Sequence, residues 1–178
     1  MTSFTIEVKD ESVQAALKAL AARVNDMSAV LDTIGTGIIE RTQRRFDTST
    51  GPDGVAWKKN SATTLAMLSE SIGRSKSNRK KDGSLNARGS RLLANKKPLI
   101  GPTGLLGKQF HSLVVDNTLT VSSPFVYSAI QQFGGKAGRG LKVTIPARPF
   151  LPIRQDGSLY PQEQAEILEA LNNYLSDI

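Results

Sequence analysis

The sequence offers few side chains for catalysis or metal binding. It contains no cysteine and a single histidine, His111. Disulfides, iron–sulfur clusters, thiolate zinc sites and cysteine nucleophiles are therefore excluded, and any histidine site would have to be built around one residue. His111 lies between Phe110 and Ser112 in a run typical of a strand, which favours an ordinary sheet residue. A carboxylate pair brought together by the fold stays open as an enzymatic alternative. We expect a protein that is not an enzyme.

A glycine-rich stretch at residues 101–109 resembles a phosphate-binding loop at first sight. Pro102 stands where that loop needs its first glycine, and Gln109 stands where a serine or threonine would bind magnesium. We therefore interpret the stretch as a turn that leads into a sheet. No nucleotide, metal or other cofactor is expected.

Most of the positive charge lies in one segment. The chain has 178 residues, with 23 Lys and Arg against 16 Asp and Glu, a net charge of +7. Residues 71–97 contain nine basic residues and one acid, Asp82, so this segment carries +8 and the rest of the chain carries −1. It is rich in Ser, Gly and Asn and poor in apolar residues, a composition typical of a segment that cannot repay its ordering entropy. We predict one domain over residues 1–178 with a flexible basic insertion at about 71–97.

The basic segment suggests a partner with negative charge. Clustered lysines and arginines bind phosphates nonspecifically by releasing counterions, which makes duplex DNA one candidate. The absence of aromatic residues from 71 to 97 removes a stacking platform for single strands. An acidic protein surface and simple solvation remain open. The candidate contact residues are Arg74, Lys76, Arg79, Lys80, Lys81, Arg88 and Arg91.

Hydrophobic spacing predicts an α+β fold. Apolar residues recur at three- and four-residue steps over 13–24 and again over 30–46, which indicates two N-terminal helices. Alternation at Phe4, Ile6 and Val8 predicts a short strand. Runs at 110–115 and 118–121 flank Asp116-Asn117 and predict a β-hairpin in a small antiparallel sheet.

The C-terminal third completes this α+β order. We predict a short helix at 125–133 that ends at Gly134-Gly135, and a strand at 141–145 that stops at Pro146. Pro161 opens a closing helix with one apolar stripe, in which Glu163, Glu166 and Glu169 are expected to be mostly solvated. No run of 18 apolar residues occurs, so no membrane contact is expected.

Two stretches suggest partner contacts. Residues 124–135 place three large apolar side chains on one side of a helical turn ahead of two glycines, and two prolines in 145–152 stiffen the segment that carries Arg148 and Phe150. An arginine beside a rigid aromatic residue is a common interface anchor, and a corner of the core is the equal alternative. The candidate interface residues are Trp57, Tyr127, Gln131, Phe133, Arg148 and Phe150.

In order and spacing, several short motifs resemble the phage virion morphogenesis family, the tail-completion or head–tail neck proteins of contractile-tailed, Mu-like phages. The motifs are Phe46 with Pro52-Asp53-Gly54 and Trp57, Thr103-Gly104-Leu105 with Ser112, Ser122-Ser123, Tyr127 to Gly135, and Ile145 to Leu151. The family's third stretch often reads Tyr-Ala-x-Ile-His-Gln-Phe-Gly, whereas this chain has Ser128 and Gln131 at the corresponding alanine and histidine. No metal or pH-sensing role is therefore carried over from that histidine.

The resemblance implies a structural protein that acts late in particle assembly. Its implied place is the neck or the head-proximal end of the tail in the virion, after assembly in the cytoplasm of the bacterial host. Its implied partners are other copies of itself in a ring, together with tail or head-completion proteins. At such a place, genomic DNA in the neck channel is a further candidate partner of the basic segment.

Overall fold

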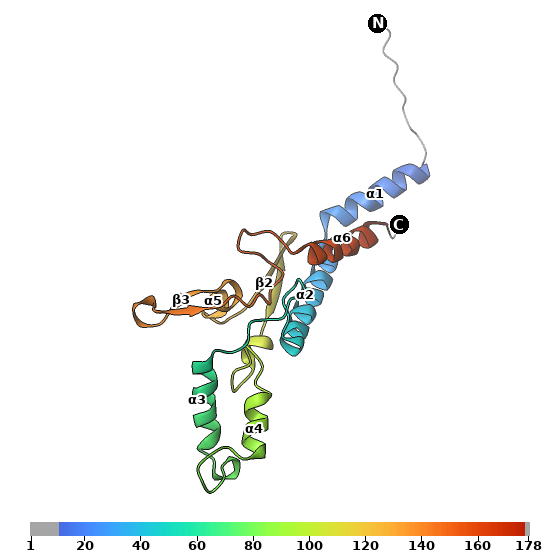
Figure 1. Cartoon of the computed structure of the whole chain (residues 1–178). Coiled ribbons are helices and arrows are strands. Elements are labelled where there is room, and N and C mark those ends of the chain that lie inside the picture. Colours follow the sequence, from blue (N-terminus) through green and yellow to red (C-terminus); the bar gives the residue numbers. More distant parts are fainter. Residues whose placement is uncertain (1–10, 177–178) are drawn as a thin grey trace.

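The computed structural model describes residues 11–176, which form an α+β fold, as predicted (Figure 1). The strand predicted at Phe4 to Val8 lies outside the described residues. The helices are α1 (Glu11–Asn25), α2 (Ser28–Thr48), α3 (Ala62–Gly73), α4 (Ala87–Ala94), α5 (Ser128–Phe133) and α6 (Pro161–Ser176). The strands are β1 (His111–Val115), β2 (Thr118–Ser122), β3 (Gly135–Ala137) and β4 (Val143–Ile145). Single 3₁₀ turns lie at Lys76–Asn78, Leu105–Gly107 and Arg139–Leu141.

The predicted hairpin around residues 116 and 117 is confirmed. β1 pairs antiparallel with β2, with Val115 opposite Thr118. Asp116 and Asn117 both adopt positive φ, 47° and 57°, the conformation that a tight two-residue hairpin turn requires. The Asn117 side chain also accepts a hydrogen bond from the Met27 amide at 3.0 Å and donates one to the Asn25 carbonyl at 3.1 Å. The turn of the hairpin therefore fixes the junction between α1 and α2.

The long helix α2 lies on this hairpin. Val30, Ile34 and Ile38 are buried against residues of β2 and α6. A Cβ on Gly35 would come within 2.9 Å of the Leu119 side chain, so this glycine permits the close approach of helix and hairpin. The glycines at 35 and 37 therefore do not interrupt the helix, because packing on the hairpin outweighs their low helix propensity.

A second cluster is aromatic and forms the centre of the molecule. Phe46 packs edge to face on Trp57 with ring centroids 5.2 Å apart, and lies 5.3 Å from Phe150. Phe110 and Leu106 complete the buried set. The indole nitrogen of Trp57 donates to the Pro149 carbonyl at 2.8 Å. Burial of these rings joins the end of α2 to the segment around residue 150, which is far away in the sequence.

A buried ion pair connects α2 with α6. The side chain of Glu163 is 2% exposed and accepts from Arg45 at 2.7 Å, while Arg45 also donates to the Phe150 carbonyl at 2.9 Å. Arg41 binds the other oxygen of Glu163 and reaches Glu166 at 2.8 Å. The prediction of a mostly solvated Glu163 was therefore wrong, because two arginines of α2 provide partners that compensate for its burial.

Two arms project from this body (Figure 1). We call residues 62–94, which contain α3 and α4, the helical hairpin, and β3 with β4 the β arm. α3 and α4 pack on each other. Their N-termini are capped by the Ser61 side chain, which accepts from the Thr64 amide at 3.2 Å, and by Asn86, which accepts from Gly89 at 3.0 Å.

The helical hairpin corrects the expectation of an irregular segment at 71–97. A helix covers Ala87–Ala94 and a 3₁₀ turn covers Lys76–Asn78. Asparagine caps and a few half-buried apolar residues are enough to form a short helical pair, although the composition of the segment resembles that of a loop. The β arm matches its prediction at β4, but a turn at Arg139–Leu141 replaces the first part of the predicted strand.

Candidate interaction surfaces

The two arms enclose a groove, which we call the inter-arm groove. It has a volume of about 920 Å³ and lies between α3, the linkers of the helical hairpin, α5 and β4. The linkers are held together by a hydrogen bond of 3.3 Å from the Asn60 side chain to the Lys96 carbonyl. Three of the predicted interface residues line it, namely Tyr127, Gln131 and Arg148. The remaining side chains used below are Lys58, Lys59, Met67, Lys96, Lys142 and Val143.

Arg148 positions the floor of this groove. Its side chain is buried and donates to the carbonyls of Lys58 at 2.8 Å and Lys59 at 3.0 Å. Its backbone amide donates to the Gln131 carbonyl at 2.9 Å. Burial lowers the pKa of the guanidinium from its usual value. Because its donors bind backbone, Arg148 holds the linker that presents the two lysines instead of reaching outward as an anchor.

Two consecutive glutamines near the end of α5 make different contacts. Gln132 is buried; its side-chain oxygen accepts from the amides of Phe150 and Leu151, and its nitrogen donates to the carbonyls of Leu151 and Ile153. Gln131 lines the groove, and its buried Oε1 has no partner within residues 11–176. We selected Gln131 from the sequence and missed Gln132, although it directly precedes Phe133 in the same motif.

The predicted aromatic residues separate into two groups. Trp57 and Phe150 lie inside the core, as the core alternative expects for both. Tyr127 and Phe133 lie on the surface, and the Tyr127 ring stacks on Phe125 with centroids 5.4 Å apart. Next to them, Val126 is 99% exposed. The start of α5 is therefore an exposed apolar surface, and its role as an interface stays a prediction.

The tip of the helical hairpin gathers five of the predicted basic residues. Arg74, Lys76, Arg79, Lys80 and Lys81 surround a hollow of about 550 Å³. A Cβ on Gly73 would lie 2.6 Å from the Arg79 side chain, so the glycine allows this guanidinium to cross the end of α3. The remaining two predicted residues, Arg88 and Arg91, are exposed on α4.

Side-chain hydrogen bonds order the tip. Asn78 donates to the Ile72 carbonyl at 3.0 Å, and the Asn86 amide donates to the Asn78 carbonyl at 2.9 Å. The Ser84 hydroxyl and amide both donate to Asp82, and these bonds lower the pKa of that carboxyl. Asp82 therefore stays ionised at neutral pH and shapes the turn, while the cations around it remain in excess.

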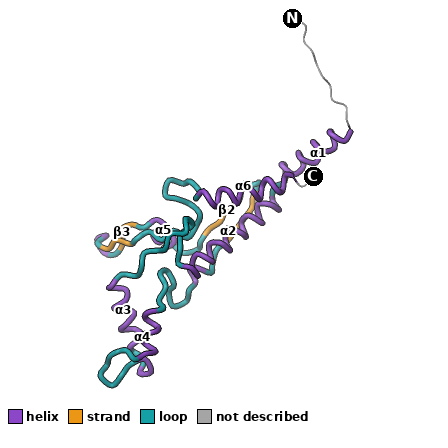
Figure 2. Tube along the Cα trace, turned by 45° about the vertical axis from the view of Figure 1, so that its right-hand side comes forward, coloured by secondary structure: helices purple, strands orange, loops and turns teal. Residues whose placement is uncertain are grey.

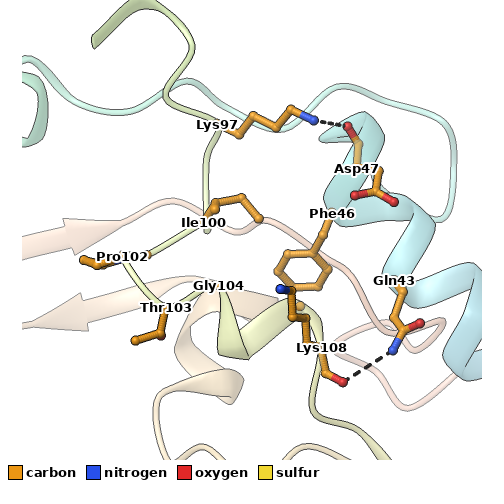
Figure 3. A pocket seen from close by; sticks show the side chains of 11 residues that line it. Gln43, Phe46, Asp47, Lys97, Ile100, Pro102, Thr103, Gly104 and Lys108 are labelled. Atoms are coloured by element: carbon orange, nitrogen blue, oxygen red, sulfur yellow. Dashed lines mark hydrogen bonds between the residues drawn. The ribbon is translucent and has the colours of Figure 1, made fainter. Parts of the chain in front are cut away.

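The glycine-rich stretch lies in a different hollow, which Figure 3 shows. This space of about 550 Å³ lies beside the Phe46 ring, between the end of α2 and residues 97–108. Its borders are fixed by Lys97, which donates to the Asp47 carbonyl at 2.6 Å, and by Gln43, which donates to the Lys108 carbonyl at 3.4 Å (Figure 3). Residues 101–107 turn into the short 3₁₀ segment ahead of β1, which confirms the predicted turn.

Two remaining candidates concern His111 and a possible cluster of metal ligands. His111 is an exposed residue of β1. In the part of the chain that the structure describes, no three histidine, aspartate or glutamate side chains gather as a metal site. Within the same residues, no helix combines the length and apolarity needed to span a bilayer.

Comparison with known proteins agrees with the motifs. Mu-like prophage FluMu G protein 2 of Haemophilus influenzae is 52% identical over 59 residues, which cover 33% of this chain and 38% of that protein. The match thus spans well under half of the relative's length. No solved structure matches the chain. A sequence model of the phage virion morphogenesis family matches residues 8–176, almost the whole chain. The chain belongs to the phage virion morphogenesis family and has a role in the morphogenesis of a phage particle.

Proposed function

We propose that this chain is a non-enzymatic structural subunit that completes the tail or joins head and tail at the neck, and that it acts as a ring of identical copies. Membership of the phage virion morphogenesis family supports a role in the assembly of a phage particle. The shape of the subunit supports the assembly role, because its arms and α1 extend away from the two buried clusters (Figure 1).

The observation that carries the proposal is the large exposed surface. The chain has an accessible area of 12647 Å², whereas a compact monomer of 19.2 kDa exposes about 8,400 Å². Twelve residues lie outside the described range, and even fully extended they add only about 1,900 Å². More than 2,000 Å² of excess surface therefore belongs to the described fold. Subunits of obligate assemblies carry such surface because their neighbours bury it.

A closed ring of identical copies would bury part of this exposed surface on every subunit. A head-to-tail contact joins two different patches of the subunit and closes when the rotation between copies closes. The candidate patches are the exposed start of α5 and the inter-arm groove, together with α1, which lies on the surface along its whole length. Lysine, arginine and aromatic side chains on these patches suit contacts with a partner.

Deletion of the gene tests the place of action. We expect electron microscopy of the resulting lysate to show DNA-filled heads and separate tails, and a plasmid copy of the wild-type gene to restore joined particles. The negative control is the same plasmid with a stop codon after residue 60. Joined, infectious particles in the deletion lysate would contradict the proposal, as would a loss of heads.

A second candidate function is contact with duplex DNA through the tip of the helical hairpin. The five cations around the hollow carry it, because their positive charge is concentrated in one short turn. We expect fluorescence anisotropy to detect binding to a duplex at about 50 mM salt, with a log–log salt slope of about −0.9 for each phosphate neutralised.

Matched variants separate this candidate from general basicity. Changing Arg79, Lys80 and Lys81 to alanine should weaken binding at least tenfold. The same change at Lys136, Arg139 and Lys142 on the β arm removes equal charge and should leave most of the binding. Equal loss in both variants, or no binding by the wild-type protein, would overturn the DNA contact.

A further inference from the structure

The wall of the inter-arm groove carries charge of one sign only. Five charged side chains line it and none of them is an acid; they are Lys58, Lys59, Lys96, Lys142 and Arg148. Lys96 and Arg148 are engaged inside the chain, because both donate to backbone carbonyls. The three other lysines are exposed and form no ion pair within residues 11–176. Their positive charge is therefore free to attract an acidic molecule into the groove.

The same wall exposes apolar side chains. Met67 of α3 is 67% exposed, Val143 of β4 is 54% exposed and Tyr127 is 48% exposed, and all three line the groove. A protein segment that covers these side chains gains from removing them from water. The phosphate backbone of duplex DNA binds through charge and gains nothing from this cover. The occupant that fits therefore carries apolar side chains as well as negative charge.

The free edge of β4 adds backbone groups to the wall. β4 pairs with β3 on one side, with Val143 opposite Ala137, and has no second neighbouring strand in the described part of the chain. Residues 142–146 line the groove and no residue of β3 does, so the free edge faces the groove. Such an edge presents unpaired N–H and C=O groups in alternation. An extended peptide can pair with both kinds of group.

Contacts within the chain hold the groove in shape before anything binds. Arg148 fixes the carbonyls of Lys58 and Lys59, and the Asn60 side chain fixes the carbonyl of Lys96. In Figures 1 and 2, the helical hairpin and the β arm extend from the same end of the molecule, opposite α1. A bound segment can therefore contact both arms with little ordering cost on the side of this chain.

We propose that the inter-arm groove binds an extended acidic segment of a second protein of the phage particle. The segment adds a strand to the free edge of β4, covers Met67 and Val143 with apolar side chains, and pairs its acids with the three exposed lysines. Because successive side chains of a strand point to opposite faces, we expect acidic and apolar residues to alternate in it. This inference rests on the proposed assembly role and leaves the start of α5 and α1 for contacts between copies.

Peptide binding to the purified full chain tests the chemistry of the occupant. The probe is a short fluorescein-labelled peptide of alternating glutamate and valine with blocked ends. We expect fluorescence anisotropy to detect binding that weakens as the salt concentration rises. A peptide of alternating lysine and valine has the same length and the same apolar residues with the opposite charge, and it should not bind. Equal binding of both peptides, or no binding of the acidic peptide, would overturn the proposal.

Matched charge reversals test the place of binding. Lys58→Glu combined with Lys142→Glu should weaken binding of the acidic peptide at least tenfold. Lys136→Glu combined with Arg139→Glu changes the net charge equally on the same arm, but neither residue lines the groove, so most of the binding should remain. All four side chains are exposed, so circular dichroism should be unchanged in both variants. Equal losses in the two variants would show that the groove is not the site.

Hydrogen exchange tests whether the peptide adds a strand. Bound peptide should slow exchange of at least one amide between Val143 and Ile145, whereas the amides of β3 should keep their rates, because the outer edge of β3 lies away from the groove. The same peptide with N-methylated backbone amides keeps every side chain and charge but cannot donate to β4, so it should bind at least tenfold more weakly. Unchanged exchange in β4, with full binding of the methylated peptide, would overturn strand addition.

Competition identifies other occupants of the groove. Displacement of the labelled peptide by unlabelled duplex DNA at an equal concentration of negative charge would assign the groove to DNA and overturn the proposal. Release of single subunits from an oligomer when the peptide binds would show that a neighbouring copy fills the groove, and this result would overturn it as well. We expect neither result.

Complementation separates this inference from the proposed function. In the gene-deletion host, a plasmid copy with Lys58→Glu and Lys142→Glu should leave heads and tails separate, although the purified variant keeps the oligomeric mass of the wild-type protein. Joined, infectious particles from this variant would overturn the role of the groove and leave the proposed function standing. Joined particles from the deletion alone would instead contradict the proposed function.

Discussion

Arginines in the body and arginines in the helical hairpin have different environments and different roles. Arg45 and Arg148 are buried, and their donors bind backbone carbonyls or the carboxylate of Glu163. Arg74 and Arg79 are exposed at the hairpin tip, in a segment with nine basic residues and one acid. A buried charge with complete partners fixes the architecture, whereas an exposed excess of charge is available for a partner. Burial, more than residue type, therefore separates structural residues from candidate contacts.

The largest effect is expected where the body is most tightly packed. Phe150→Ala should lower the free energy of unfolding by about 3–5 kcal/mol, because it leaves a cavity among the aromatic rings of Phe46 and Phe110. Urea unfolding followed by Trp57 fluorescence measures this change. The control is Val126→Ala, which should change stability by less than about 0.5 kcal/mol because Val126 is exposed. Similar values for the two variants would contradict the division between core and surface.

The second-largest effect on stability is expected at the buried Arg45. Arg45→Met leaves part of the Glu163 charge buried without its partner and should cost about 3 kcal/mol. Arg79→Met at the hairpin tip is the matched change and should cost less than about 0.5 kcal/mol. Thermal unfolding of both variants provides the comparison. The double variant Arg45→Met with Glu163→Met should recover much of the loss, because the uncompensated charge is then removed; no recovery would show that the pair is not the cause.

Removing the whole helical hairpin should affect the body only slightly. The linkers on either side lie close together, since the Asn60 side chain binds the Lys96 carbonyl, so a short Gly-Ser linker can replace residues 62–94. Both buried clusters remain in this variant. We expect a cooperative unfolding transition with a stability within about 1 kcal/mol of wild type. Loss of cooperative unfolding would show that the hairpin belongs to the core and would remove the contrast between the two regions.

The smallest effect is expected from lowering the pH at the tip of the helical hairpin. Hydrogen bonds from Ser84 lower the pKa of Asp82 in the folded hairpin, so their contribution is present above the ordinary aspartate pKa of 3.8 and is lost as the pH falls through the lowered value. Protection of the Ser84 amide against hydrogen exchange should therefore rise with pH below 3.8, as the carboxylate ionises, and should be constant above it, after correction for intrinsic rates. Asp82→Asn should remove this pH dependence, and an unchanged profile would contradict the role of the carboxylate.

The sequence predicted what depends on local patterns. Helix spacing, the Asp116-Asn117 turn and the closing helix at Pro161 all follow from short-range rules, and the structure confirms them. Composition was misleading for residues 87–94, because caps at single asparagines do not change the average composition of a segment.

The site was harder to predict than the fold. The sequence placed Arg148 and Tyr127 in conspicuous motifs, and both line the inter-arm groove. The burial of Glu163 and the bonds of Gln132 depend on partners more than fifteen residues away, so periodicity could not reveal them. Periodicity could not reveal the groove either, because its walls come from residues 58–67, 96–106 and 127–148, which are separated in the sequence.

The central claim is that this subunit leaves its projections exposed for neighbouring copies. Its most direct test is the mass of the purified wild-type protein in solution, measured by native mass spectrometry and light scattering over a range of concentrations. We expect one closed species with a mass several times 19.2 kDa, stable on dilution. A single species of 19.2 kDa at every concentration would contradict it.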